Sequence, residues 1–143
     1  MEAQELHRGR LIDHVQLVVD DLPACRRFYD AVFAVLGVPL GGEFPGGDFW
    51  YDELFVSGPN SEAALGKLTG RHHLAFQAAD RAQVEAFHKA GLAAGGADNG
   101  APGERPYHPG YYAAFLTDPA GNNIEAVFHG EATRSAPSVQ ITF

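Results

Sequence analysis

Two stretches of ten residues, IDHVQLVVDD at 12–21 and RHHLAFQAAD at 71–80, align without gaps and indicate the fold. His14 aligns with His73, at an offset of 59 positions (73 − 14 = 59). The same offset aligns further positions downstream, namely Phe28 with Phe87 and Gly37 with Gly96. Two copies of one module explain a repeat that keeps strand, helix and helix-end positions in register.

Each stretch alternates apolar and polar residues, as a half-buried strand does. The polar face carries His14 and Gln16 in the first copy, and His73 and Gln77 in the second. Because an apolar face packs on a helix, the opposite polar face is expected to line a wet cavity. Gln16 and Gln77 are therefore predicted to line that cavity and contact the substrate.

A helix is predicted after each strand. The first is capped by Asp21 or Leu22, has Pro23 at its first position and stops at Gly37. The second repeats this pattern: Asp80 and Gln83 resemble a capping box at its start, and Gly95-Gly96 marks its end.

Short strand-like runs follow the helices at 48–51, 111–117 and 123–128, and the turn at 118–122 predicts a hairpin between the last two. The glycine- and proline-rich segment 95–110 is expected to form a long loop that acts as a lid. We therefore expect a single α+β domain over 1–143, with two βαβββ modules that form a curved mixed sheet around one cleft. The expected parts are module 1 at about 11–57, a linker at 58–70, module 2 at about 71–130 and a tail at 131–143.

Composition restricts the function. The chain has 143 residues, 45% of them hydrophobic, with 10 basic and 18 acidic side chains and a net charge of −8. This charge argues against nucleic acid and anionic membranes as partners. With no apolar run long enough to span a bilayer and no signal peptide, we expect a cytoplasmic protein. The single cysteine, Cys25, excludes an internal disulfide and a cysteine-rich zinc site, and its place on the apolar helix face predicts that it is buried.

Three residues of metal-ligand type fall at related places in the two modules. His14 and His73 are equivalent by the repeat, and Glu125 stands on the final strand. Two imidazoles and one carboxylate suit a divalent ion with open coordination positions, namely Fe, Mn, Zn or Ni. The pattern predicts one such ion for each chain.

In the order IDHV at 12–15, HLAF at 73–76 and DPAGNNIE at 118–125, these motifs resemble the vicinal oxygen chelate superfamily over about residues 11–129. That superfamily includes glyoxalase I, extradiol dioxygenases, fosfomycin resistance enzymes and bleomycin resistance proteins. The resemblance implies that His14, His73 and Glu125 are metal ligands. It also implies a homodimer, and the apolar tail ending at Phe143 is expected to help bury an edge.

The chain differs from the residue pattern of each subfamily, and these differences bear on which subfamily it resembles most. Glyoxalase I adds a carboxylate ligand on the last strand of the first module, where this chain is expected to place Trp50 or Tyr51. Fosfomycin-type enzymes use basic side chains, which are scarce here. The extradiol pattern keeps its histidine as His108, but Phe115 replaces its tyrosine. By that resemblance His108 is a catalytic acid or base. The residues expected to contact the substrate, besides the two glutamines, are Trp50, Tyr111 and Phe115.

The sequence thus predicts a metal-dependent enzyme, either a dioxygenase or a lyase or isomerase, acting on a small oxygen-bearing substrate that chelates the ion. Extradiol-dioxygenase-like chemistry is favoured among these. The alternative is a binding protein without turnover, of the bleomycin resistance type, for which a net charge of −8 suits a cationic drug. A second alternative is a fold whose pocket serves only assembly. Whether the cleft forms within one chain or between two stays open.

Overall fold

A computed structural model describes residues 5–8, 12–61, 66, 68–133 and 138–142. The first module contains four strands and one helix, in the order β2 (Val15–Val18), α1 (Leu22–Leu36), β3 (Gly42–Glu43), β4 (Phe49–Tyr51) and β5 (Leu54–Ser57). The second repeats this order: β6 (His73–Gln77), α2 (Arg81–Ala93), β7 (Ala97–Glu104), β8 (Tyr112–Thr117) and β9 (Asn123–Phe128). Two further strands, β1 (Glu5–Arg8) and β10 (Val139–Thr142), pair near the chain ends.

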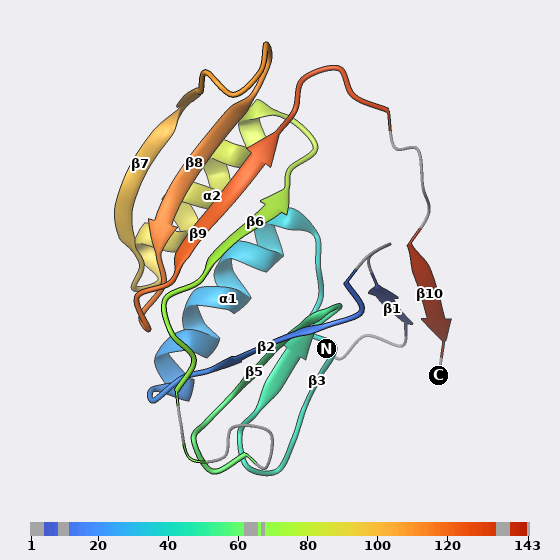
Figure 1. The fold of residues 1–143 in the computed structure, drawn as a ribbon, viewed down its shortest axis with the longest axis vertical. Coiled ribbons are helices and arrows are strands. Elements are labelled where there is room, and N and C mark those ends of the chain that lie inside the picture. Colours follow the sequence, from blue (N-terminus) through green and yellow to red (C-terminus); the bar gives the residue numbers. More distant parts are fainter. Residues whose placement is uncertain (1–4, 9–11, 62–65, 67, 134–137, 143) are drawn as a thin grey trace.

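Each module forms its own four-stranded mixed sheet. The strand order is β2-β5-β4-β3 in the first and β6-β9-β8-β7 in the second, so the first strand of each module lies at a sheet end. In both sheets this first strand runs parallel to the module's last strand, and the other pairs are antiparallel. The α+β class with two βαβββ modules is confirmed (Figure 1).

Both helices begin where the sequence places their signals, and α1 also ends there, whereas α2 ends at Ala93 with Ala94 as its C-cap, just before the predicted Gly95-Gly96. The Asp21 carboxylate accepts a hydrogen bond from the backbone N–H of Ala24 at 3.0 Å, and α1 ends at Gly37, whose φ of 76° is left-handed. Asp80 caps α2 by accepting from the N–H of Gln83 at 2.7 Å. These caps fix the direction in which each helix leaves its strand.

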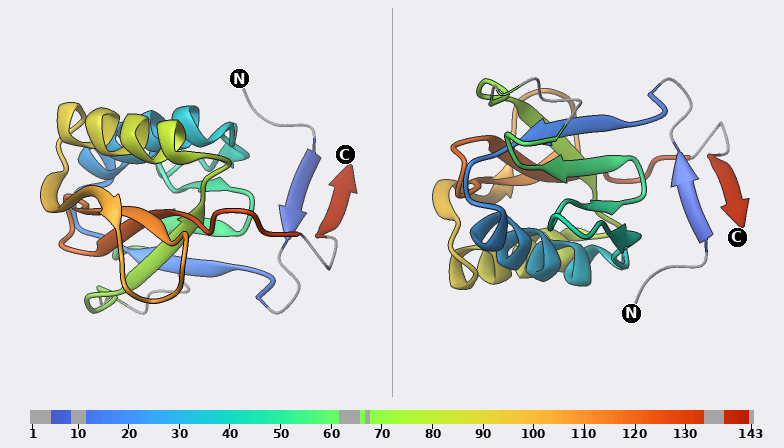
Figure 2. Two further views of the ribbon diagram at one scale, coloured as in Figure 1. Left: turned by 90° about the horizontal axis from the view of Figure 1, so that it is seen from above. Right: turned by 90° about the horizontal axis from the view of Figure 1, so that it is seen from below.

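The two modules share one core. In both views of Figure 2 the helices lie side by side, with β2, β6 and β9 on the opposite side. Phe33 of α1 contacts Tyr51 of the first sheet and Phe76 of the second, at ring-centroid distances of 4.5 and 4.9 Å. Cys25, on the same helix, is buried as predicted, and burial raises the pKa of its thiol to about 12.

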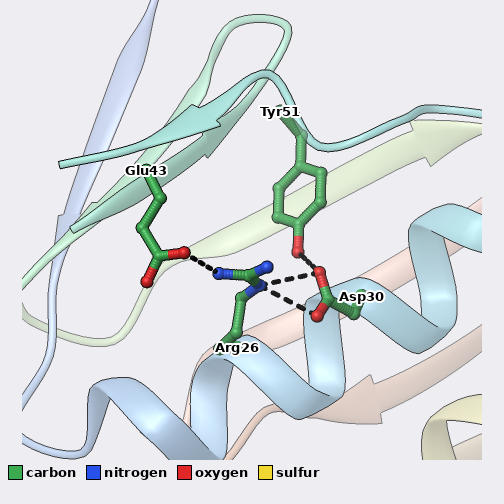
Figure 3. A network of polar contacts seen from close by, with 4 residues as sticks. All are labelled: Arg26, Asp30, Glu43 and Tyr51. Carbon is green, nitrogen blue, oxygen red and sulfur yellow. Dashed lines mark hydrogen bonds and ion pairs between the residues drawn. The ribbon is translucent and has the colours of Figure 1, made fainter. Parts of the chain in front are cut away.

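A polar network attaches α1 to the first sheet (Figure 3). The Arg26 guanidinium donates to both oxygens of Asp30, at 2.9 and 2.8 Å, and to Glu43 of β3 at 3.0 Å. The Tyr51 hydroxyl donates to Asp30. Because burial and this carboxylate both disfavour the phenolate, the pKa of Tyr51 is raised.

A buried carboxylate organises the hairpin between β8 and β9. Asp118 is 4% exposed and accepts from the Tyr29 hydroxyl at 2.6 Å and from the Asn122 side-chain amide at 2.8 Å. It also accepts from the backbone N–H groups of Ala120 and Asn122. The predicted turn is therefore tied to α1 through Tyr29.

Two sequence expectations need correction. Half of the segment predicted as a long loop at 95–110 is strand β7, an edge strand with register shifts between Asp98 and Gly100 and between Gly100 and Gly103. The first module also has a last strand, β5, that the sequence reading omitted. Parts of the expected linker (62–65 and 67), and Phe143 of the tail, lie outside the described residues.

Strands β1 and β10 form a separate antiparallel ribbon at one end of the molecule, in which Leu6 pairs with Ile141 (Figures 1 and 2). Across the described ranges, neither helix has the length and apolar character that a membrane span requires.

Candidate functional site

Two of the predicted metal ligands meet on the second sheet. His73 begins β6 and Glu125 lies on the adjacent strand β9, and the distance from His73 Nε2 to Glu125 Oε2 is 3.1 Å. The Glu125 side chain is only 3% exposed, whereas that of His73 is 50% exposed. The carboxylate is thus held inside the sheet surface, and the imidazole lies between it and solvent.

The hydrogen bonds of His73 define its tautomer. Its Nδ1 lies 3.0 Å from the backbone carbonyl oxygen of Asn123, and a carbonyl only accepts. Nδ1 therefore carries the hydrogen, and in the neutral ring Nε2 directs a lone pair at the Glu125 carboxylate. Two acceptors 3.1 Å apart repel unless a positive charge lies with them, either a proton on the ring or a metal ion.

The other carboxylate oxygen is held by a phenol. The Tyr111 hydroxyl donates to Glu125 Oε1. Partial burial, with the neighbouring Glu125 carboxylate, raises the pKa of Tyr111 to about 12, so the phenol stays a donor at neutral pH. The ring of Phe115 stacks on His73 at 6.0 Å and 26°. Glu125 and His73 are therefore each positioned by a specific neighbour.

His108 lies next to Tyr111. Its ring contacts Tyr111 at a centroid distance of 5.3 Å, and its Nε2 lies 2.9 Å from Nδ1 of His129. Because His108 Nδ1 donates to the carbonyl of Pro109 at 2.9 Å, its Nε2 accepts from His129 when both rings are neutral. The predicted acid or base thus packs on the ring of Tyr111, whose hydroxyl donates to Glu125, and its two ring nitrogens are hydrogen-bonded to Pro109 and His129.

His14 is presented by the first sheet. It precedes β2, its side chain is 58% exposed, and its Nδ1 lies 2.7 Å from the Asp13 carboxylate. Since the carboxylate accepts, Nδ1 carries the hydrogen, and in the neutral ring Nε2 keeps the lone pair. His14 and His73 thus both present Nε2, with Nδ1 held by an oxygen acceptor.

Within one chain His14 does not join the other two. In the part of the chain that the structure describes, no three His, Cys, Asp or Glu side chains form a group that could hold a metal ion. The two sheets are separate, and His14 and His73 stand at their end strands. Both a cleft within one chain and a cleft between two chains are compatible with the sequence; in the structure His14 lies apart from the pair formed by His73 and Glu125.

The remaining predicted contacts lie on the same two sheets. Gln16 donates from Nε2 to Ser57 Oγ at 2.7 Å, and Gln77 is exposed at the end of β6. Trp50 and Phe115 occupy corresponding places: Trp50 pairs with Phe55 between β4 and β5, and Phe115 pairs with Glu125 between β8 and β9.

This register identifies a residue that the sequence reading missed. Across the first sheet, Gly42, Trp50, Phe55 and Gln16 are paired in one row. The corresponding row of the second sheet is Gly100, Phe115, Glu125 and Ala75. Phe55, and neither Trp50 nor Tyr51 as expected, therefore stands where the first module would place a carboxylate ligand. The signal was available only through strand pairing, because β5 was not predicted.

The donors suit a divalent metal ion. Imidazole nitrogen and carboxylate oxygen bind such ions at about 2.0–2.2 Å. Two donor atoms 3.1 Å apart can both reach one ion at those lengths. Metal ligands in proteins are typically oriented by a further hydrogen bond. Both candidate ligands have one: Nδ1 of His73 donates to a backbone carbonyl, and Glu125 accepts from the Tyr111 hydroxyl.

The sequence and the structure were compared with those of known proteins, and one protein family matches. The sequence model of the Glyoxalase/Bleomycin resistance protein/Dioxygenase superfamily matches residues 11–126. A search of curated proteins finds no match.

Three solved structures illustrate the similarity. A glyoxalase/bleomycin resistance protein from Albidiferax ferrireducens is 31% identical, with a TM-score of 0.68, and the match covers 82% of this chain and 97% of that one. A lactoylglutathione lyase from Agrobacterium tumefaciens is 25% identical, with a TM-score of 0.60 and coverage of 83% and 93%. A glyoxalase-related enzyme from Fulvimarina pelagi, at 21% identity, shares the fold with a TM-score of 0.66 and coverage of 90% and 100%.

Proposed function

Because this chain belongs to the Glyoxalase/Bleomycin resistance protein/Dioxygenase superfamily, we propose that it is a metal-dependent enzyme. Its substrate is a small molecule that chelates one divalent ion through oxygen. Members of the superfamily include a lactoylglutathione lyase and a glyoxalase-related enzyme, which supports an enzymatic role. His14, His73 and Glu125 are the proposed ligands.

One observation carries this proposal: His73 Nε2 lies 3.1 Å from Oε2 of the buried Glu125 while its Nδ1 donates to the backbone carbonyl of Asn123. A salt bridge to a protonated ring also satisfies this geometry. A metal ion satisfies it too, and it additionally explains why a second histidine, His14, presents Nε2 in the same way from the equivalent strand.

The bound ion would polarise the substrate oxygens and lower the pKa of a hydroxyl attached to it. The residues of this chain have separate tasks. Glu125 supplies negative charge, Tyr111 holds its second oxygen, and His108 would take up or release a proton at Nε2, the nitrogen that lies 2.9 Å from His129 Nδ1.

We place His14 of a second copy at the pair formed by His73 and Glu125, giving a homodimer with two shared sites. β2 and β6 are each the end strand of their sheet, and Val18 of β2 also exchanges hydrogen bonds with Thr69. A two-fold dimer in which each copy gives His14 and receives the partner's His14 satisfies both sites at once.

Mixing two inactive variants tests this assembly. His14→Ala and His73→Ala should each lose bound metal, but co-refolded subunits should regain it, because each heterodimer then contains one intact site. Random pairing predicts about a quarter of the parental metal per chain. No recovery would place the three ligands within one chain, and full metal in both single variants would overturn the metal site itself.

Activity is tested separately from metal binding. A panel of catechols, 2-oxoaldehyde–thiol adducts and cationic drugs should give turnover with one of the first two classes. Oxygen uptake with catechols selects dioxygenation, and isomerisation of the adducts selects glyoxalase chemistry. Tight drug binding without turnover would favour the sequestering alternative.

A further inference from the structure

Two exposed imidazoles outside the proposed ligand set lie against each other on the second module. His108 lies shortly before β8, and His129 directly follows β9. Nε2 of His108 and Nδ1 of His129 are 2.9 Å apart, and the two ring planes differ by 20°. We call His108 and His129 the imidazole pair.

The backbone beneath the imidazole pair holds its spacing. Gly110 and Gly130, close to His108 and His129 in the chain, both have left-handed φ, of 87° and 78°. A Cβ added to Gly130 would lie 3.4 Å from the Cα and the carbonyl oxygen of Gly110, so the two segments are in direct backbone contact. The Tyr111 ring stands nearly perpendicular to both imidazoles, with centroid distances of 5.3 Å to each. Two imidazoles from separate segments are thus held together by the fold itself.

The hydrogen bonds of the pair show which nitrogens could bind an ion. Nδ1 of His108 donates to the carbonyl of Pro109 at 2.9 Å, so Nε2 has the free lone pair in the neutral ring. A carbonyl at the other nitrogen is also the arrangement that orients a metal-ligating histidine. When no ion is bound, His129 donates its Nδ1 hydrogen to His108. Because the His129 ring is exposed, this hydrogen can instead stand on Nε2 and face water, which frees Nδ1 as a second ligand with no net loss of a proton.

The spacing favours ions that take ligands at right angles. An imidazole nitrogen lies about 2.0–2.1 Å from a divalent ion, so two nitrogens 2.9 Å apart subtend an angle of about 90° at the ion. Square-planar Cu²⁺ and Ni²⁺ take ligands at that angle, whereas tetrahedral Zn²⁺ needs its ligands further apart. Among the described residues no third His, Cys, Asp or Glu side chain joins the pair, so water would complete the coordination.

We propose that the imidazole pair is a second metal site, at which His108 Nε2 and His129 Nδ1 bind one Cu²⁺ or Ni²⁺ ion. It is separate from the site proposed for His14, His73 and Glu125, and it stands whether or not that site binds metal. An ion at the pair would occupy the nitrogen at which His108 is proposed to exchange a proton. It would therefore withdraw His108 from proton transfer, and this consequence alone rests on the proposed function.

Copper binding to a protein that lacks the first site tests the proposal. In the double variant His14→Ala, His73→Ala, one Cu²⁺ per chain should bind with an electron paramagnetic resonance spectrum of two coordinated nitrogens. Adding His108→Ala or His129→Ala should remove this two-nitrogen spectrum. Each should also weaken Cu²⁺ binding roughly 100-fold, the low end of the gain from two linked contacts.

Chemical modification reports on the nitrogen of His108 directly. Diethyl pyrocarbonate acylates an accessible imidazole nitrogen, and peptide mass spectrometry locates the modified residue. Cu²⁺ should protect His108 of the double variant from this modification, because the ion covers Nε2 while Nδ1 is held by Pro109.

Two further variants separate ion binding from other effects. His129→Gln keeps an amide that can donate a hydrogen bond to His108 but has no imidazole, so it should lose the ion as His129→Ala does. His88→Ala is the matched control. It removes an imidazole whose Nε2 lies 2.9 Å from the Asp98 carboxylate, and it should leave the two-nitrogen spectrum in place and the affinity within about twofold.

A spectrum of one coordinated nitrogen in the double variant would overturn the proposal, and so would parental copper affinity in His129→Ala or His129→Gln. Loss of the spectrum in His88→Ala, or modification of His108 at the same rate with and without Cu²⁺, would also overturn it. None of these outcomes depends on the proposed function, because the background lacks His14 and His73. Metal loss in the single variants His14→Ala and His73→Ala tests that function separately.

Discussion

Removing the Tyr111 hydroxyl, by Tyr111→Phe, should weaken metal binding without changing a proposed ligand. The phenol donates to Oε1 of Glu125, whose side chain is 3% exposed. Bulk water therefore cannot replace the lost donor freely, and the carboxylate is left with one oxygen unsatisfied. A hydrogen bond to a charged group contributes about 1.5–3 kcal/mol, and loss of a partner of a metal ligand costs about 10- to 100-fold in affinity.

The neighbouring residue supplies the control. Tyr112 also donates its hydroxyl to a carboxylate, Glu85 Oε1, at 2.8 Å, but this carboxylate belongs to α2. Tyr112→Phe is the same chemical change and should leave metal affinity within about twofold of the parent. Competition with a chromogenic chelator measures both variants. Parental affinity in Tyr111→Phe, or an equal loss in Tyr112→Phe, would refute the positioning of Glu125 by Tyr111.

Three other predictions concern the fold. Asp118→Ala should reduce the free energy of unfolding by about 2–4 kcal/mol, because it strands the buried Tyr29 hydroxyl and the turn, and Tyr29→Phe should cost less in the same urea titration. Gly42→Ala should destabilise by about 1–3 kcal/mol and shift Trp50 emission, whereas Gly46→Ala, with open space around it, should do neither. Burial raises the pKa of the Cys25 thiol from 9.0 to about 12, so at pH 8 the thiolate population should be about a thousandfold smaller than in the unfolded chain. A thiol reagent should therefore label the folded protein far more slowly than the protein unfolded in urea, and equal labelling rates would contradict this.

The repeat made the module order predictable because its signals are local. Asp21, Pro23 and Gly37 act through the backbone of their own helix ends, and the structure shows helix α1 between the predicted cap and stop. Strand β7 was not predictable in this way. Its sequence, ADNGAPGE, disfavours strands, and it forms one only because β8 pairs with it along a bulged edge, where Gly100 and Pro102 are tolerated.

Phe55 shows why the site was harder to predict than the fold. His14 and His73 are 59 positions apart, but Phe55 and Glu125 are 70 apart, because the second module is longer between its helix and its last strand. A gap-free alignment therefore cannot match them, and only the pairing of Phe55 with Gln16 and of Glu125 with Ala75 does so. The pairing of residues across neighbouring strands stays the same when the loops between the strands change length. Equivalent site residues in the two modules are therefore found from strand pairing and not from their spacing along the chain.

That register has a chemical consequence. The equivalent rows have diverged to complementary tasks: one places a carboxylate beside His73, and the other places a flat ring beside His14. If a second copy brings the two rows together, each shared site receives donors from both modules, with Phe55 beside His14 and Phe115 beside His73. The carboxylate of Glu125 is the feature that only one of the two rows supplies, so a ligand there would turn its polar end toward Glu125 and His73 and its apolar part toward Phe55.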